Sequence, residues 1–250
     1  MTGQIQTSKQ ANIATITFSH PASNSFPSTL LDRLVENINR LGNDAEVHVI
    51  ILQSAGEKAF CAGASFEELV AIQTLKEGEK FFLGFANLLN AMRICKKIII
   101  GRVQGKAVGG GVGIISACDY VFASESAAVK LSELSIGIGA FVIEPAVSRK
   151  IGLAAFSELT LDATHWQTAY WAKEKGLYTK VFENIREMDV SIRELAMKLA
   201  SYNTNALAEM KKVLWQGTNH WNELLIERAK ISGELVLSDF TKAALQKFKK

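Results

Sequence analysis

Three consecutive glycines, Gly109 to Gly111, constrain this chain more than any other feature of its sequence. They lie in the stretch from Gly105 to Tyr120, GKAVGGGVGIISACDY, whose apolar second half is typical of a buried helix. Because glycine has no Cβ, the backbone there can approach a ligand at van der Waals distance. Unpaired N–H groups and the positive end of the helix dipole meet where a helix begins. The stretch therefore predicts a helix N-terminus that faces resident or developing negative charge.

The spacing of these glycines excludes two common phosphate-binding loops. A P-loop requires Gly-Lys-Ser or Gly-Lys-Thr after the loop, and a dinucleotide-binding turn requires G-x-G-x-x-G; neither pattern occurs here. An isolated glycine triplet could still serve only close helix packing. A second small-residue stretch, Phe60 to Ala64, also follows a predicted buried strand. This second loop favours a ligand site over a packing role.

Length and composition predict one large domain, or one domain with a helical appendage, that is ordered nearly end to end. The chain has 250 residues, 48% of them hydrophobic, and only three prolines. Lys and Arg number 28 and Asp and Glu 25, so the formal charge of +3 gives no reason to expect nucleic acid or a membrane as partner. The start of the chain lacks a signal-peptide pattern, and no apolar run is long enough for a membrane span. We therefore expect a cytoplasmic protein.

Three cysteines, Cys61, Cys95 and Cys118, show neither CxxC nor Cys/His spacing. An odd number of cysteines without such spacing disfavours both a disulfide framework and a zinc site. We expect them to pack as small apolar side chains, and we expect no metal site.

The hydrophobic pattern predicts a mixed α/β chain that ends in helices. Predicted strands are Ile13 to Phe18, Val47 to Gln53, Ile98 to Val103, Asp119 to Ala123, Ala127 to Leu131 and Tyr178 to Phe182. Predicted helices are the one from an N-cap at Ser28 to Gly42, then Glu67 to Leu75, Lys80 to Cys95, Val142 to Lys150, Ala154 to Leu161, Trp166 to Lys175, Met188 to Tyr202, Ala206 to Trp215, Asn222 to Leu237 and Phe240 to Phe248. A recurring order of strand, strand and helix differs from the alternation of a doubly wound fold.

Four parts of the chain, taken together, resemble the crotonase superfamily, the enoyl-CoA hydratases and isomerases. They are Phe60 to Ala64, Gly105 to Gly111, Asp119, and Ala169 to Leu177 (AYWAKEKGL). The resemblance implies an α/β fold: a crotonase-like spiral of β-β-α units, which we place at residues 1–190, and a C-terminal helical oligomerisation region at residues 191–250. It also implies a homotrimer or hexamer and an acyl-CoA substrate. No cofactor is expected, because coenzyme A is part of the substrate.

The resemblance also places an oxyanion hole between the two glycine-containing loops. A thioester that reacts at its α or β carbon develops negative charge on the carbonyl oxygen, which two preorganised N–H donors stabilise. By resemblance, these donors are the N–H groups of Ala64 and Gly110. Family members usually carry Asp after the alanine, where this chain has Ser65, and this departure bears on contacts with coenzyme A. The expected substrate-binding residues are Ala62, Ser65, Phe66, Gly109 and Phe141.

Hydratases of the resembled family use two glutamates, and this chain keeps one of them. The first position, three residues beyond the middle glycine, is Gly113; the second corresponds to Glu133, with Ser132 in place of the usual proline. Glu133 stands among apolar residues, where partial burial would raise its pKa and let it carry a proton near neutral pH; a surface glutamate is the alternative. Related isomerases and dehalogenases carry a catalytic Asp at the position of Phe141, where this chain has no carboxylate. Glu144, three residues later, is the second candidate acid.

We therefore expect an enoyl-CoA hydratase/isomerase-type enzyme, a lyase or isomerase, that acts on an unsaturated acyl-CoA through an enolate, with Glu133 as proton shuttle. One glutamate suffices to move a proton between Cα and Cγ, whereas the addition of water ordinarily needs a second carboxylate. A methylglutaconyl-CoA hydratase and an acyl-CoA decarboxylase or other lyase remain as alternatives. A catalytically impaired acyl-CoA-binding scaffold is the alternative from another class.

Overall fold

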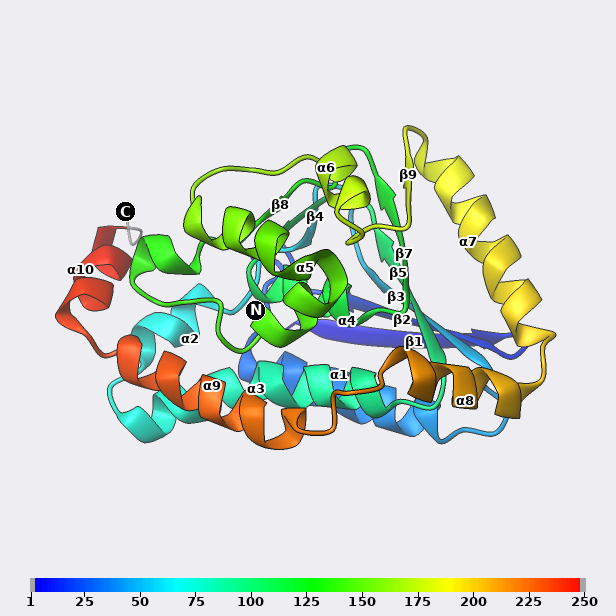
Figure 1. Ribbon diagram of the computed structural model, residues 1–250, viewed down its shortest axis with the longest axis horizontal. Helices are drawn as coiled ribbons and strands as arrows, with labels where there is room; N and C mark the ends of the chain where they lie inside the picture. Colours follow the sequence, from blue (N-terminus) through cyan, green and yellow to red (C-terminus); the bar gives the residue numbers. More distant parts are fainter. Residues whose placement is uncertain (1–2, 248–250) are drawn as a thin grey trace.

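A six-stranded sheet forms the centre of the molecule, which the computed structural model describes from residue 3 to residue 247. Its strands follow the order β1-β2-β3-β5-β7-β9 (Figure 1). β1 and β2 pair antiparallel and all later neighbours pair parallel, as crossover connections require. The bounds are Gln4–Gln10 (β1), Ile13–Ser19 (β2), Val49–Ser54 (β3), Ile98–Val103 (β5), Tyr120–Ser124 (β7) and Lys180–Phe182 (β9).

A second, three-stranded sheet positions the candidate site. Its order is β4-β6-β8, with the bounds Ala59–Cys61, Lys106–Val108 and Val129–Lys130. All three strands are parallel, so their carboxyl ends meet at one edge. Three loops therefore leave this edge together: residues 62–65, residue 109 before the next helix, and residues 131–132.

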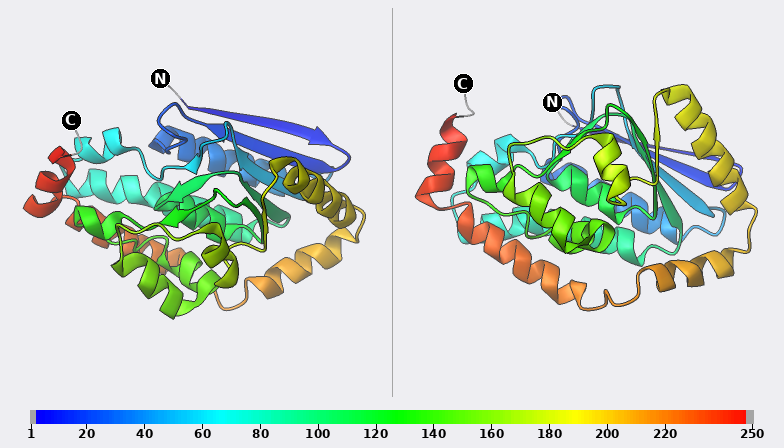
Figure 2. Two further views of the ribbon diagram at one scale, coloured as in Figure 1. Left: turned by 90° about the horizontal axis from the view of Figure 1, so that it is seen from above. Right: turned by 45° about the horizontal axis from the view of Figure 1, so that its top comes forward.

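Helices α1, α3 and α4 pack on one face of the large sheet and α7 (Ile185–Ala200) packs on the other (Figures 1 and 2). Successive residues of β3 alternate between the two sides: Ile50 lies in the main core, whereas Val49 packs with Met188 and Ile192 of α7. The first four helices are Ser28–Gly42 (α1), Phe66–Ala71 (α2), Leu75–Ile94 (α3) and Gly110–Ala117 (α4).

Helices α5 (Glu144–Leu161) and α6 (Ala169–Glu174) come before the last part of the chain. From α7 to α10, the helices run around the outside of the molecule from the end of the sheet back to the candidate site (Figure 2). The bounds of these helices are Ile185–Ala200 (α7), Thr204–Leu214 (α8), Trp221–Leu235 (α9) and Asp239–Lys247 (α10). Helix α9 lies along α3 with their backbones in contact, since a Cβ on Gly233 would lie 2.7 Å from the backbone nitrogen of Glu79. Glycine at this crossing is what allows the close approach.

A buried polar cluster around Asp119 joins α8 and Trp215, the residue after it, to the sheet. Its carboxylate lies 2.8 Å from the ammonium of Lys211 and accepts hydrogen bonds from Trp215 Nε1 at 2.7 Å and from the backbone N–H of Ile99 at 2.7 Å. The side chains of Asp119 and Lys211 are each 3% exposed, so neither charge is shared with solvent.

Several predicted elements need correction. The polar, mostly exposed strand β1 was not predicted, because its sequence, QIQTSKQ, lacks an alternation of apolar and polar residues. Ser28 is the first residue of α1 and not its N-cap; Pro27 occupies that position, and Ser28 Oγ donates to the carboxylate of Glu68 at 2.6 Å. Helix α3 begins at Leu75 instead of Lys80, because Thr74 and Glu77 form a capping box.

Two elements near the C-terminal part bear on the prediction. The break predicted between the helices Val142 to Lys150 and Ala154 to Leu161 is present, because the backbone of α5 is non-helical at Gly152, where φ is +78°. Helix α6 begins at Ala169 instead of Trp166, because the side chain of Thr168 caps it. Phe248, the predicted end of the last helix, lies outside the described residues.

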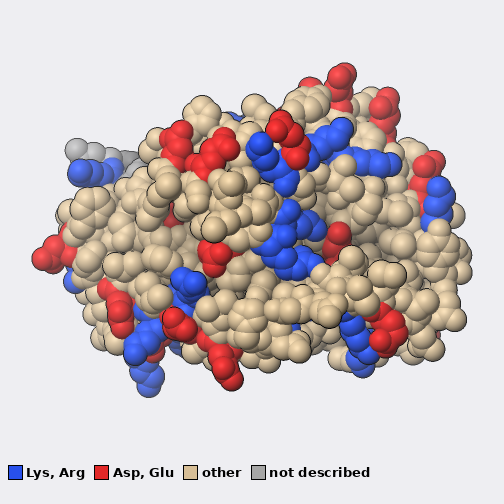
Figure 3. Space-filling model, viewed as in Figure 1, with Lys and Arg blue, Asp and Glu red and all other residues tan. Residues whose placement is uncertain are grey.

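The surface and the helix lengths bear on possible partners. On the face shown in Figure 3, Lys and Arg lie among Asp and Glu, with one small basic group near the middle. None of the helices between residues 3 and 247 is long and apolar enough to cross a membrane.

The division of the chain into a spiral core at residues 1–190 and a C-terminal helical oligomerisation region at residues 191–250 stays a prediction.

Candidate functional site

The two glycine-containing loops pack against each other at the carboxyl edge of the small sheet. A Cβ on Gly63 would lie 3.0 Å from the carbonyl oxygen of Val108 and 3.6 Å from the nitrogen of Gly110. Gly63 has φ +87° and Gly109 has φ +54°, a region that side-chain-bearing residues rarely adopt. Glycine at these positions therefore permits both the turns and the close approach.

Within the described residues, the loop backbone around Ala64 and Gly110 offers no backbone acceptor to their N–H groups. Phe26 donates to the carbonyl of Gly63 at 2.8 Å and accepts from the N–H of Ser65 at 2.9 Å, so this bridge bypasses Ala64. Gly110 is the first residue of α4, where an N–H has no acceptor within its own helix. Across residues 3–247, no loop or turn hydrogen bond between backbone groups uses either N–H as donor.

The Glu133 carboxylate lies against the glycine loop. Glu133 begins a short 3-10 helix after β8, and a Cβ on Gly109 would lie 2.6 Å from its Oε1. The residue as a whole is partly exposed, but Oε2 is buried and has no hydrogen-bond partner among the described residues. Burial disfavours the charged form and raises the pKa of Glu133 to about 7. A carboxyl group with this pKa can accept and return a proton near neutral pH.

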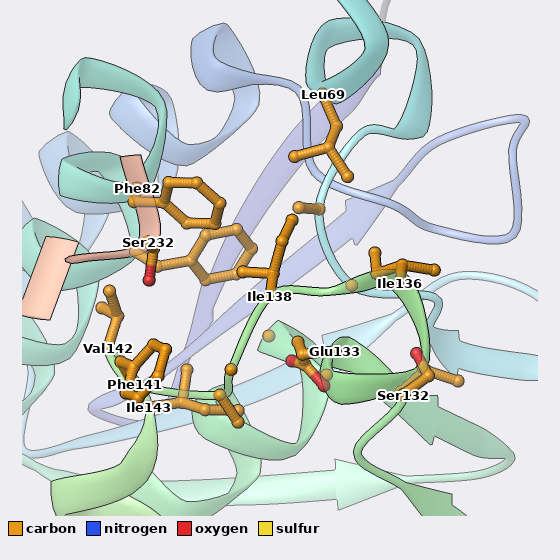
Figure 4. A pocket seen from close by; sticks show the side chains of 18 of the residues that line it. Leu69, Phe82, Ser132, Glu133, Ile136, Ile138, Phe141, Val142, Ile143 and Ser232 are labelled. Atoms are coloured by element: carbon orange, nitrogen blue, oxygen red, sulfur yellow. The ribbon is translucent and has the colours of Figure 1, made fainter. Parts of the chain in front are cut away.

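A cavity of about 190 Å³ opens between these loops and helices α3 and α9 (Figure 4). Glu133 is the one charged side chain that lines it within residues 3–247. Most of the remaining wall is apolar or aromatic: Leu69, Phe81, Phe82, Phe85, Ile136, Ile138, Phe141, Val142 and Ile143. A carbonyl group held at the two free N–H groups would thus have Glu133 close by and a dry surface around it.

Isoleucine fills the space beside Gly113. A Cβ on Gly113 would lie 2.4 Å from Cγ2 and 2.8 Å from Cβ of Ile143, and Ile143 itself lines the cavity. The position of the missing carboxylate is therefore closed by an apolar side chain.

Most of the predicted substrate-binding residues lie at the cavity. Ala62, Phe66, Gly109 and Phe141 line it together with Ala64 and Gly110. Ser65 does not; its buried hydroxyl caps α2 by accepting from the N–H of Glu68 at 3.3 Å.

Glu144, the second candidate acid, lies outside the cavity. It is the first residue of α5, and its carboxylate lies 3.9 Å from the guanidinium of Arg228.

Much of the apolar cavity wall was not predicted from the sequence, including Phe82, Ile143 and Ser232. Ile143 lies two residues after the predicted substrate-binding residue Phe141, which is the one signal that could have pointed to it. Ser232 gave no signal, because it reaches the cavity only through the packing of α9 on α3. Among residues 3–247, no group of three or more His, Cys, Asp or Glu side chains could hold a metal ion.

Comparison with known proteins places this geometry in context. A family model described as enoyl-CoA hydratase/isomerase matches residues 8–248. The chain is 32% identical to a short-chain-enoyl-CoA hydratase of Clostridium acetobutylicum, covering 84% of this chain and 80% of that protein. It is 29% identical to a peroxisomal Delta(3,5)-Delta(2,4)-dienoyl-CoA isomerase of Arabidopsis thaliana, covering 71% and 67%. The crystal structure of an enoyl-CoA hydratase from Bacillus halodurans superposes with a TM-score of 0.90 at 22% identity, covering 97% and 99% of the two chains.

Proposed function

Because this chain belongs to the enoyl-CoA hydratase/isomerase family and has its crotonase fold, we propose that it isomerises an unsaturated acyl-CoA thioester through an enolate. The predicted fold class and the predicted class of enzyme, a lyase or isomerase, are confirmed. Beyond the family and the class of enzyme, the proposal specifies the reaction, isomerisation, and the residues that carry it out: Ala64, Gly110 and Glu133. The observation that carries it is the Glu133 carboxylate, which lies against Gly109 with its Oε2 buried and unpaired.

In the proposed reaction, the N–H groups of Ala64 and Gly110 hold the thioester carbonyl oxygen. Negative charge moves onto this oxygen as the proton leaves the α carbon, and two preorganised donors stabilise it where water is largely excluded. Neither N–H has to break another backbone hydrogen bond first. No cofactor beyond the coenzyme A of the substrate takes part in the proposal.

Glu133 carries the proton in this scheme. Its carboxylate removes a proton from the α carbon of a 3-enoyl thioester, and the C–H electron pair moves into the enolate. The protonated carboxyl then returns the proton to the γ carbon, so the double bond shifts from C3–C4 to C2–C3. A pKa of about 7 suits a group that must both accept and release a proton.

Hydration is the second candidate, since a relative with 32% identity is a short-chain-enoyl-CoA hydratase. It would require Glu133 to position and activate water alone, because Gly113 supplies no carboxylate and Ile143 fills the adjoining space. We therefore place isomerisation ahead of hydration for a straight-chain substrate.

The deciding experiment offers purified protein a 3-enoyl-CoA and a 2-enoyl-CoA separately. Formation of the conjugated thioester is followed by absorbance and the products are identified. We expect conversion of the 3-enoyl to the 2-enoyl thioester and poor hydration of the 2-enoyl thioester. Glu133→Gln should reduce turnover by about 10² to 10⁴ fold, because the amide cannot accept the proton.

Glu144→Gln is the matched control, since Glu144 lies outside the cavity and should tolerate the change. Loss of activity in Glu144→Gln with full activity in Glu133→Gln would contradict the assignment of the proton shuttle. Tight acyl-CoA binding without any turnover would favour the scaffold instead.

A second experiment isolates the Gly110 donor. Any Cβ on Gly110 would lie 2.2 Å from the Phe85 ring, so substitution there perturbs packing whatever it does to the N–H. Gly110→Ala keeps the N–H and adds this contact, whereas Gly110→Pro adds the contact and removes the N–H. We expect the proline variant to turn over about 10² to 10³ fold more slowly than the alanine variant. Equal rates in two folded variants would remove Gly110 from the oxyanion hole.

A further inference from the structure

The end of the cavity opposite Glu133, which we term its inner end, lies away from the proposed reacting group and is lined by Phe82, Val142 and Ser232. In Figure 4, Glu133 and Ser132 lie on one side, and Phe82, Val142 and Ser232 lie on the other. Phe82 belongs to α3, Ser232 to α9, and Val142 to the segment before α5. An acyl chain whose carbonyl sits at the oxyanion loops and whose tail enters the cavity therefore ends among these side chains.

This inner end offers nothing to a negatively charged group. No Lys, Arg or His lines the cavity within residues 3–247. The Ser232 hydroxyl already donates to the carbonyl oxygen of Arg228 at 3.1 Å within its own helix. A carboxylate placed here would lose its hydration without a cation in exchange, and an ionised Glu133 in the same cavity would repel it.

Arg228 is the cation that has to be considered, because it lies one helical turn before Ser232 on α9. Its Nη2 lies 3.9 Å from the carboxylate of Glu144, outside the cavity, and it does not contribute to the cavity wall. Its Nε is nevertheless buried without a hydrogen-bond partner among the described residues. Any test of charge selection must therefore include this residue.

We propose that the cavity selects hydrocarbon acyl groups and rejects acyl groups that end in a carboxylate. The proposal rests on the proposed function, since it takes this cavity as the acyl site of a coenzyme A thioester. The size agrees with a short chain: the cavity measures about 190 Å³. An apolar cavity of about 150 Å³ holds benzene, so roughly six to eight carbon atoms fit here.

The test compares thioesters that match in carbon number and differ only in the terminal group. Hex-3-enoyl-CoA is compared with the six-carbon thioester in which the C6 methyl group is replaced by a carboxylate. The quantity compared is kcat/KM for conversion to the 2-enoyl thioester. We expect the hydrocarbon substrate to be preferred by at least about 100-fold, because the carboxylate would be desolvated without a partner. Calorimetric titration with saturated hexanoyl-CoA and adipoyl-CoA supplies a readout that needs no turnover. Here we expect hexanoyl-CoA to bind at least about tenfold more tightly.

Two variants of α9 complete the design. Arg228→Gln removes the nearby cation, and Lys230→Gln removes an exposed one from the same helix. The preference should be the same in both variants as in the wild type. Adipoyl-CoA binding as tightly as hexanoyl-CoA would overturn the proposal. Selective loss of adipoyl-CoA binding in Arg228→Gln would then identify Arg228 as the counterion of the terminal carboxylate. Tighter binding of hexanoyl-CoA with no conversion of either unsaturated thioester would uphold charge selection and contradict the proposed isomerisation.

Discussion

At the scale of single residues, the burial of Glu133 suits proton transfer but lowers the stability of the folded protein. Its carboxylate is buried, and no cation among the described residues lines the same cavity; burial raises its pKa to about 7 from 4.5. The same burial that tunes the group for proton transfer makes its ionised form unfavourable in the folded state. Residues of this kind commonly lower stability in exchange for function.

The pH dependence of stability should reveal this conflict. Because the folded-state pKa lies above the unfolded value, the proton favours folding; the contribution is fully present below pH 4.5 and is lost as pH rises to about 7. Glu133→Gln stays neutral throughout. Relative to this variant, the wild type should lose about 3 kcal/mol of unfolding free energy between these pH values, measured by urea denaturation. Parallel profiles for the two proteins would show that the carboxyl group titrates normally.

Gly113 and Ile143 supply a second test at this scale. Gly113→Glu alone should destabilise the fold, since its Cβ would overlap Ile143, and overpacking typically costs about 1–3 kcal/mol. Gly113→Glu combined with Ile143→Ala makes room for the new carboxylate. We expect the double variant to hydrate a straight-chain 2-enoyl-CoA at least about tenfold faster than the wild type, because a second acid can position water. Ile143→Ala alone is the control, and equal hydration by it would assign the gain to cavity size.

At the scale of elements, the cavity depends on how closely α9 approaches α3. Gly78 and Gly233 face each other across this crossing, and a Cβ on Gly78 would lie 2.8 Å from the carbonyl oxygen of Gly233. Ser232, the neighbour of Gly233, lines the cavity. The helix–helix distance and the cavity wall are therefore set by the same backbone contact.

Gly233→Ala should separate these two helices. The added methyl group meets backbone atoms that cannot rotate away, so we expect a loss of about 1–3 kcal/mol in thermal or urea unfolding. Glu234→Ala, at an exposed position of the same helix, should change stability by about 0.5 kcal/mol or less. A folded Gly233→Ala protein with wild-type stability would mean that the crossing relaxes without cost.

At the scale of the whole molecule, the Asp119 cluster links the C-terminal helices to the sheet. Asp119 follows α4, while Lys211 lies on α8 and Trp215 directly after it. Helix α9 begins at Trp221, six residues after Trp215, so this link helps to determine where α9 starts. The predicted trimer or hexamer, which would use the same region, stays a prediction.

Adjacent lysines provide a matched test of this link. Lys211→Met leaves the Asp119 carboxylate buried without its cation, and breaking a buried pair in this way typically costs about 3–5 kcal/mol. Lys212→Met breaks a pair with Glu209 whose side chains are 70% and 69% exposed, and it should cost less than about 1 kcal/mol. Equal unfolding midpoints for the two variants would show that the buried pair does not hold α8 in place.

The sequence by itself determined the features that depend on local chain chemistry. A glycine triplet before an apolar helical stretch predicted the helix that begins at Gly110, and the family motif singled out Glu133. The strand Ile98–Val103 was also predicted correctly, because its three consecutive isoleucines are β-branched residues that favour a strand. Backbone conformation over a few residues is set by the residues themselves, and so these elements needed no partner to be recognised.

Only the tertiary structure decided what surrounds those elements. Ser65 caps a helix instead of lining the cavity, Ile143 occupies the space beside Gly113, and Ser232 lines the inner end of the cavity from a distant part of the chain. The buried, unpaired Oε2 of Glu133 likewise depends on atoms from several loops. Such contacts follow from how whole helices and sheets pack, and hydrophobic periodicity specifies which face of an element is buried but not which residue it meets.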